Sequence, residues 1–193
     1  MNYNIEKREL IISKKVNELD VFVLDFVNLL KEYVLVSGYV SILTGRSRAT
    51  EDIDLLIPPL DIKEFEEYWK TFEKAGFECL NTSKPDEAFS MLKEHAIRFA
   101  KKGKPIPNME FKLITNDVQK YSLDHKIKVI LGKRQMFISP LEMQIAYKLF
   151  LGSEKDLEDA KHLYVLFKEK FNKKELLSLI DKLEVKDKLK LIQ

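Results

Sequence analysis

Two aspartates separated by one residue are the side chains of this chain whose type and spacing most clearly indicate chemistry. Asp52 and Asp54 flank Ile53 in an apolar run that ends at Pro58, and such a run predicts a buried β-strand. Residues two apart on a strand point to the same face, so the two carboxylates project together. Neighbouring carboxylates repel each other unless a cation lies between them, and two oxygen ligands on a rigid strand suit Mg²⁺ bound to a triphosphate. An exposed strand face that merely carries two acids is the alternative interpretation.

A strand-to-helix turn earlier in the chain contains small residues in a position that favours anion binding. Ser37-Gly38 follows the β-branched run Val34–Val36 and precedes a predicted helix over Tyr39–Leu43. The free N–H groups at a helix start attract anions, Gly38 lets the backbone approach a phosphate closely, and the Ser37 hydroxyl adds a donor. An ordinary strand-to-helix turn has the same pattern.

Arginine is used sparingly in this chain, and its placement is informative. The 33 basic residues comprise five arginines and 28 lysines. Two of the five, Arg46 and Arg48, lie close together just before the paired aspartates. Because the planar guanidinium binds phosphate oxygens in a bidentate manner, this placement predicts a phosphate contact, with a chance surface position as the alternative.

Together these residues resemble a known family. A small residue with glycine, followed by Gly-x-x-Arg-x-Thr-x-Asp-h-Asp, resembles the nucleotidyltransferase superfamily with the DNA polymerase β-like fold. Within it, the pattern is similar to the minimal branch that includes the AbiEii-type nucleotidyltransferases of abortive-infection and toxin–antitoxin systems. The resemblance covers about the first 140 residues and continues weakly into the helices that follow. Its positions in this chain are Ser37, Gly38, Gly45, Arg48, Thr50, Asp52, Ile53 and Asp54.

The resemblance implies an enzyme that transfers a nucleoside monophosphate from a nucleoside triphosphate to an acceptor. Asp52 and Asp54 would hold two Mg²⁺ ions, and Glu110 on a later predicted strand would complete the metal site as the third ligand. Lys112 would either pair with Glu110 or contact the triphosphate, and Lys148 would act as a catalytic residue that neutralises the leaving charge. The implied nucleotide-binding residues are Ser37, Gly38, Arg46, Arg48, Thr50, Lys112 and Asp156.

The elements that must position these residues follow from hydrophobic periodicity and from start and stop signals. The sequence predicts an α/β (α+β) fold, with a nucleotidyltransferase-like mixed sheet flanked by helices over residues 1–138 and a helical bundle or appendage over 139–193. The expected strands are Val34–Val36, Ile53–Ile57, Ala96–Ala100, Met109–Ile114, Lys126–Leu131 and Gln135–Ile138. The expected helices span 16–30, 61–75 and 140–151, with two more starting at Ser153 and Asn172.

Composition excludes several other classes of protein. The 193 residues carry 33 basic and 31 acidic side chains, a net charge of +2, so a strongly basic nucleic-acid-binding surface is not indicated. No apolar run approaches the roughly 18 residues that span a bilayer, and the first ten residues lead into no apolar region. We therefore expect a cytoplasmic protein with no membrane partner.

Two other functions are compatible with the same residues. A degenerate member of the family would bind a nucleotide or a partner protein without transferring anything, a reading favoured if Glu110 is cancelled by Lys112. A toxin would share the chemistry, act on an RNA end or a translation component, and have an antitoxin protein as partner. The nucleotide and the acceptor, whether RNA, protein or small molecule, are not identified by the sequence.

Overall fold

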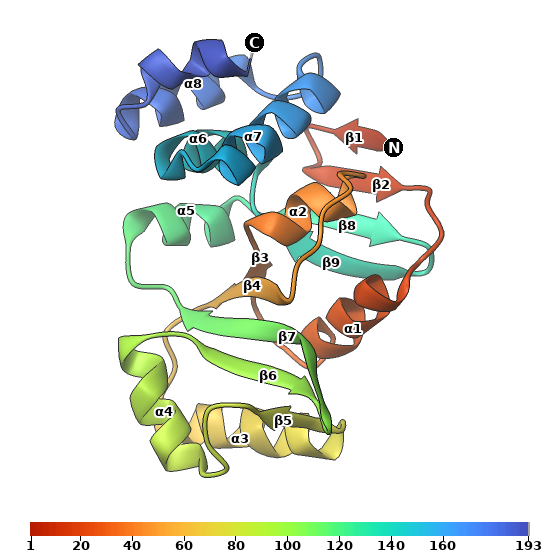
Figure 1. The fold of residues 1–193 in the computed structure, drawn as a ribbon, viewed down its shortest axis with the longest axis vertical. Helices are drawn as coiled ribbons and strands as arrows, with labels where there is room; N and C mark the ends of the chain where they lie inside the picture. Colours follow the sequence, from red (N-terminus) through yellow and green to blue (C-terminus); the bar gives the residue numbers. More distant parts are fainter. Residues whose placement is uncertain (193) are drawn as a thin grey trace.

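A nine-stranded mixed sheet forms the centre of the computed structural model, which describes residues 1–192 (Figure 1). The strands are β1 (Asn2–Asn4), β2 (Glu9–Ile12), β3 (Val34–Leu35), β4 (Asp52–Ile57), β5 (Phe77–Cys79), β6 (Ile97–Lys101), β7 (Lys104–Leu113), β8 (Ile127–Leu131) and β9 (Arg134–Ile138). Their order across the sheet is β1-β2-β8-β9-β3-β4-β7-β6-β5. Strand β4 therefore has a partner on both sides, which fixes the direction of its side chains.

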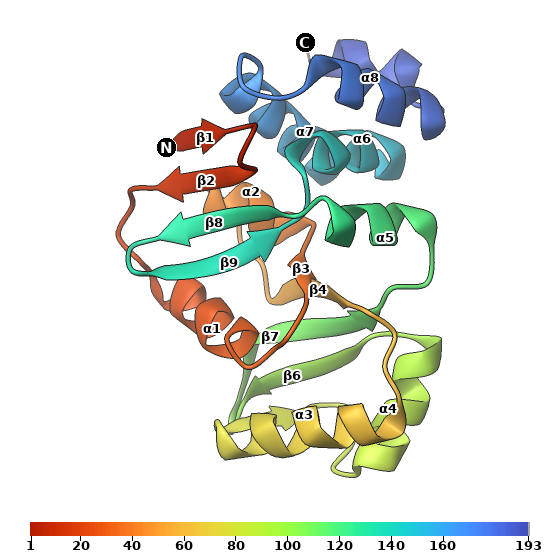
Figure 2. The ribbon, with the colours of Figure 1, turned by 180° about the vertical axis from the view of Figure 1, so that it is seen from behind.

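Helices cover both faces of the sheet and extend beyond one end of it. Seen from the two sides in Figures 1 and 2, α6, α7 and α8 stack at the end that contains β1 and β2, whereas α3 and α4 lie at the opposite end. The helices are α1 (Glu18–Val27), α2 (Gly38–Leu43), α3 (Ile62–Lys74), α4 (Pro85–Glu94), α5 (Asp117–Asp124), α6 (Leu141–Leu151), α7 (Glu154–Phe167) and α8 (Lys173–Lys182), followed by a 3-10 turn, η1 (Lys186–Leu191).

The two faces of β4 have different environments. Ile53 and Leu55 are fully buried in the main core, whereas Asp52 and Asp54 point to the opposite face and are only partly buried. Leu56, further along that second face, packs in a small apolar cluster with Leu123 of α5. Alternation along the strand thus separates the aspartates from the core, as the sequence predicts.

Aromatic packing stabilises the core face of the sheet. The Phe26 ring of α1 lies 4.7 Å from that of Phe72 in α3, and the Phe72 ring lies 4.8 Å from that of Phe99 in β6. Phe99 in turn contacts Phe111 of β7, with 5.6 Å between ring centroids. Such pairs add about 0.5–1.5 kcal/mol each beyond their buried area, so they hold β6 and β7 against α1 and α3.

The α/β fold class is confirmed, and most predicted elements are present with shifted ends. The helix expected over 16–30 begins after Asn17, because the Asn17 side chain accepts a hydrogen bond from the Asp20 N–H at 2.8 Å and caps it. The strand expected from Met109 begins earlier, at Lys104, where it pairs with the end of β6. The last residue of the predicted helical segment, Gln193, lies outside the described residues.

Sequence patterns did not predict several short elements. Strand β2 pairs in parallel with β8, more than 100 residues away, so its stability comes from a distant partner and not from a local signal. Strands β1 and β5 have three residues each, which is too short for a visible alternation. Helices α4 and α5 also went unpredicted, although Pro85 at the start of α4 and the Asn116 cap of α5 are helix-start signals. Among residues 1–192, no helix is long and apolar enough to cross a membrane.

Candidate active site

A row of carboxylates crosses two neighbouring strands. Strands β4 and β7 run parallel, with Asp54 directly opposite Glu110 and Asp52 directly opposite Asn108. Parallel neighbours lie about 4.8 Å apart, so the register brings Glu110 beside Asp54 although 56 positions separate them in the chain. The three predicted metal ligands, Asp52, Asp54 and Glu110, thus lie together on one face of the sheet.

Cationic side chains lie between these carboxylates. The Lys112 Nζ is 2.6 Å from Asp54 Oδ1 and 2.6 Å from Glu110 Oε2. The Arg98 guanidinium donates to Glu110 at 2.6 Å and lies 3.8 Å from Asp52. Of the two roles expected for Lys112, the structure shows pairing with the acids.

The acids and their lysine partner influence each other's protonation. Burial raises the pKa of Asp54 above its ordinary value, and the charge of Lys112 only partly opposes this effect. Burial also acts to raise the pKa of Glu110, but the hydrogen bond and charge of Lys112, together with Arg98, bring it below the ordinary value. For Lys112, the two acids outweigh burial and raise its pKa. Lys112 therefore favours the charged form of Glu110 more effectively than that of Asp54, where burial dominates.

The donor set around Asp52 and Asp54 suits a hard cation. Carboxylate oxygens are the ligands that Mg²⁺ uses in proteins. Asn108 is 5% exposed and donates from Nδ2 to Asp52 Oδ1 at 2.7 Å, while its own Oδ1 is buried without a hydrogen-bond partner in the described residues. An unpaired amide oxygen beside two carboxylates fits a cation ligand. Within residues 1–192, however, no three His, Cys, Asp or Glu side chains are gathered closely enough to hold a metal.

The Ser37-Gly38 turn lies at the start of α2 in an unusual backbone conformation. Ser37 has φ 61° and ψ −135°, a region that glycine occupies readily and other residues rarely. Its N–H donates to Oε1 of Gln144 on α6 at 3.1 Å. At Gly38, a Cβ atom would lie 3.0 Å from the Arg48 guanidinium, so glycine lets this arginine pack closely against the start of α2.

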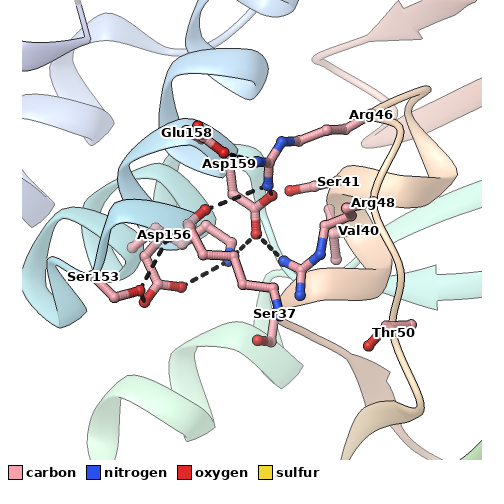
Figure 3. A network of polar contacts seen from close by, with 12 residues as sticks. Ser37, Val40, Ser41, Arg46, Arg48, Thr50, Ser153, Asp156, Glu158 and Asp159 are labelled. Carbon is pink, nitrogen blue, oxygen red and sulfur yellow. Dashed lines mark hydrogen bonds and ion pairs between the residues drawn. The ribbon is translucent and has the colours of Figure 1, made fainter.

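Arg46 and Arg48 both bind a buried aspartate of α7 (Figure 3). Asp159 has no exposed surface, and its two oxygens contact Arg46, Arg48 and Lys148, the last at 2.6 Å. Arg46 also pairs with the exposed Glu158. The two arginines are therefore held by α7, and the network joins the loop after α2 to the C-terminal helices.

Lys148 lies at the centre of this network. It is 1% exposed, and its Nζ is also 3.2 Å from Asp156 Oδ1. Burial by itself raises the pKa of Asp159, but the hydrogen bond and charge of Lys148, with Arg46 and Arg48, hold it below the ordinary value. Lys148 and Asp159 are thus a buried ion pair and not a solvated helix face.

Thr50 lies apart from these contacts (Figure 3). Its hydroxyl donates to the backbone carbonyl of Asp52 at 2.8 Å, which braces the start of β4. Thr50 therefore supports the backbone of the first aspartate.

A cavity of about 230 Å³ connects the carboxylates with the Ser37 turn. Asp54, Leu56 and Lys112 of the sheet line it, and α5 and α6 contribute further walls that include Gln119 and Gln144. Sequence reasoning did not predict Arg98, Asn108, Gln119 or Gln144 as site residues. Asn108 and Glu110 repeat the two-residue spacing of Asp52 and Asp54, and Gln144 interrupts an apolar helix, so both left a weak signal.

Two solved structures share this architecture. One is the antibiotic-resistance factor ANT(2'')-Ia, which matches with a TM-score of 0.54 over 85% of this chain and 90% of that chain at 9% identity. The other is an antigenic nucleotidyltransferase-like protein from Paracoccidioides brasiliensis, with a TM-score of 0.52 over 92% of this chain and 94% of that chain at 17% identity. No family model and no curated protein matches the sequence. The likeness therefore defines the class of fold, which is nucleotidyltransferase-like.

Proposed function

We propose that this protein is a Mg²⁺-dependent nucleotidyltransferase that transfers a nucleoside monophosphate from a nucleoside triphosphate to an acceptor. The observation that carries the proposal is the register of β4 and β7, which sets Asp54 beside Glu110 and Asp52 beside Asn108 within a nucleotidyltransferase-like fold. Three carboxylates from two separate strands repel each other and therefore require cations between them. A chance grouping of surface acids would not be expected to have this arrangement.

In this proposal Asp52, Asp54 and Glu110 hold two Mg²⁺ ions, with the unpaired Asn108 oxygen available beside them. Bound Mg²⁺ supplies charge stabilisation to the triphosphate and lowers the pKa of the acceptor hydroxyl. The Lys112 ammonium lies between Asp54 and Glu110, where it would be close enough to contact the phosphate oxygens of a bound triphosphate.

The proposed phosphate site is the Ser37-Gly38 turn with Arg48 packed against it. Gly38 leaves the backbone open, and the guanidinium of Arg48 lies next to it. We assign Lys148 to the same site, because its ammonium shares Asp159 Oδ2 with Arg48 and so determines where Arg48 lies. Arg46, Thr50 and Asp156 support these groups through the contacts described above.

A second candidate function is favoured by one observation. Lys112 pairs with both Asp54 and Glu110, which is what a member that binds nucleotide without transferring it would show. A role as toxin of a toxin–antitoxin pair belongs to the first candidate, with an RNA end as acceptor and an antitoxin as partner. A small antitoxin gene beside this one would support that role, and a solitary gene would count against it.

The test is calorimetric titration with each of the four nucleoside triphosphates, with Mg²⁺ and with EDTA. Wild type should bind at least one of them only with Mg²⁺, and Asp54→Asn should weaken that binding by about a hundredfold, the upper range for perturbed metal sites. Asp86→Asn, which changes an exposed acid in the first turn of α4, is the matched control and should bind like wild type.

Transfer is tested with α-labelled nucleotide and candidate acceptors. Label on an RNA end, a protein or a small molecule that depends on Asp54 supports the enzyme. Metal-dependent binding with no label transferred to any of them supports the nucleotide-binding module instead. Equal binding by wild type and Asp54→Asn would overturn both functions.

A further inference from the structure

The cavity between β4, α5 and α6 has features beyond those that the phosphate chemistry requires. Its volume of about 230 Å³ is below the roughly 300–1,000 Å³ of sites for drug-sized ligands, so it has room for one planar ring system and not for a chain segment. Asp54 and Lys112 line the cavity, so it adjoins the proposed metal and phosphate site. The apolar walls are formed by Val36, Leu56, Val118, Met143, Tyr147 and Leu151.

Gln144 is the buried polar group of this cavity. The residue is 4% exposed, although a glutamine buried in a helix requires partners for both ends of its amide. Its Oε1 accepts the Ser37 N–H at 3.1 Å. Because a backbone N–H can only donate, this contact fixes Oε1 as the acceptor and leaves the Nε2 donor for the cavity, with no partner for it in residues 1–192.

Gln119 of α5 repeats the same arrangement on another wall of the cavity. Its Oε1 accepts the Thr115 N–H at 2.8 Å and the Thr115 hydroxyl at 3.2 Å. Its Nε2 is therefore also a donor without a partner among the described residues. Two neutral donors on separate helices thus line an apolar cavity that opens onto the catalytic carboxylates.

We infer that this cavity binds the base of the nucleoside triphosphate, and that Gln144 and Gln119 recognise hydrogen-bond acceptor atoms on that base. The inference rests on the proposed function and adds a specificity site to it. Apolar walls suit a flat aromatic ring, whereas neutral amide donors match its carbonyl oxygens and ring nitrogens. Gln144 also connects base and phosphate recognition, because its other end holds the Ser37 turn.

Gln144→Glu separates these two roles. The substitution keeps the shape of the side chain and an oxygen for the Ser37 N–H, but it replaces the Nε2 donor by an acceptor. Gln119→Glu does the same while keeping an oxygen for Thr115. Gln135→Glu is the matched control, because Gln135 is an exposed glutamine on β9, away from the cavity.

The experiment compares the affinities of each Mg²⁺–nucleoside triphosphate and of Mg²⁺–tripolyphosphate, which has no base, by calorimetry. The added negative charge weakens both ligands, so the ratio of the two affinities isolates the base. Wild type should prefer its best triphosphate over tripolyphosphate by roughly tenfold or more, as expected for recovery of buried hydrogen bonds. Gln144→Glu should reduce this ratio by roughly tenfold, and Gln135→Glu should leave it unchanged.

The outcomes separate this inference from the proposed function. If tripolyphosphate binds wild type as tightly as every triphosphate, the base is not held and the inference fails, while metal-dependent phosphate binding stands. If Gln144→Glu and Gln119→Glu both keep the wild-type ratio, the glutamines do not read the base and the inference fails. If neither ligand binds wild type, the proposed function fails with it. Circular dichroism verifies that each variant is folded, and Gln119→Glu carries the test if Gln144→Glu is not.

Discussion

Two aspartates of this site illustrate how surroundings give one side chain opposite properties. Asp54 is partly buried with a single lysine beside it, and burial raises its pKa. Asp159 is fully buried but contacts three cations, which together overcome burial and lower its pKa. Asp54 is therefore suited to exchange its lysine partner for another cation. Asp159 is suited to stabilise the packing of α7 against the loop after α2.

Replacement of Asp159 should destabilise the protein. Asp159→Asn leaves Arg46, Arg48 and Lys148 without their shared anion in a buried position, and breaking such a cluster costs about 3–5 kcal/mol. Urea denaturation at pH 7 measures the change in unfolding free energy. Glu158→Gln is the control: its side chain is 60% exposed, so its loss should cost no more than about 1 kcal/mol. Similar costs for the two variants would contradict a buried structural role for Asp159.

The pH dependence of this difference follows from the direction of the shift. A carboxyl whose pKa is lower in the folded state stabilises the fold above the unfolded pKa, and the stability is lost as pH falls through the folded value. The advantage of wild type over Asp159→Asn should therefore be complete above about pH 5 and shrink on acidification. Denaturation series at several pH values measure it. An advantage that grew toward acid pH would mean that the pKa is raised instead.

At the scale of single elements, the β3–α2 turn contains a residue whose type does not suit its backbone conformation. Ser37 occupies a conformation that costs a residue with a side chain about 1–3 kcal/mol, and its N–H bond to Gln144 is one contact that holds it there. Glycine would adopt this conformation without that cost, so the order Ser37-Gly38 places the residue that has a side chain in the strained position.

Ser37→Gly should relieve this strain. Relief exceeds the roughly 0.5–1 kcal/mol that glycine adds in unfolded-chain entropy, so the free energy of unfolding should rise by about 1 kcal/mol. Thermal and urea denaturation both measure the change. Ser83→Gly changes an exposed serine whose φ is not positive, and it should instead lower stability by up to about 1 kcal/mol. A loss of stability in both variants would show that the Ser37 conformation is not strained.

At the scale of the whole molecule, the C-terminal helices complete the α/β part. Asp159 anchors the loop after α2, the His162 ring lies 3.2 Å from the Thr44 hydroxyl, and Glu175 of α8 accepts a hydrogen bond from Tyr121 of α5. Helix α6 is buried along most of its length, including Ile145 with no exposed surface. These ion pairs and hydrogen bonds join residues before 138 to residues after it.

Deletion of the helices should therefore prevent folding. A chain of residues 1–138 lacks Asp159, the anionic partner of Arg46 and Arg48, and it lacks the helices that cover one end of the sheet. We therefore expect no cooperative thermal transition and no near-ultraviolet circular dichroism. A chain of residues 1–185 keeps α6–α8 and serves as the control: because it lacks the buried Ile192, it should show a single cooperative transition at a lower temperature than that of the full chain. A cooperatively folded 1–138 fragment would instead show that the predicted division at 138 separates two independent domains.

The sequence by itself determined the class of fold and the strand that carries the paired aspartates. Both depend on local patterns: Asp52 and Asp54 share a face because side chains alternate along a strand, and the helix starts depend on capping residues close in sequence. The same alternation predicts that Glu110 lies on the face of its strand opposite the apolar Met109 and Phe111. None of these features requires knowledge of what lies next to them.

Tertiary structure alone decided which groups meet. The pairing of β4 with β7 set Lys112 between Asp54 and Glu110, and the packing of α7 turned Arg46 and Arg48 onto Asp159. Gln144 accepts the Ser37 N–H only because α6 packs beside the Ser37 turn. A sequence pattern gives the direction of a side chain relative to its own element, whereas its partner is set by register and packing across distant parts of the chain.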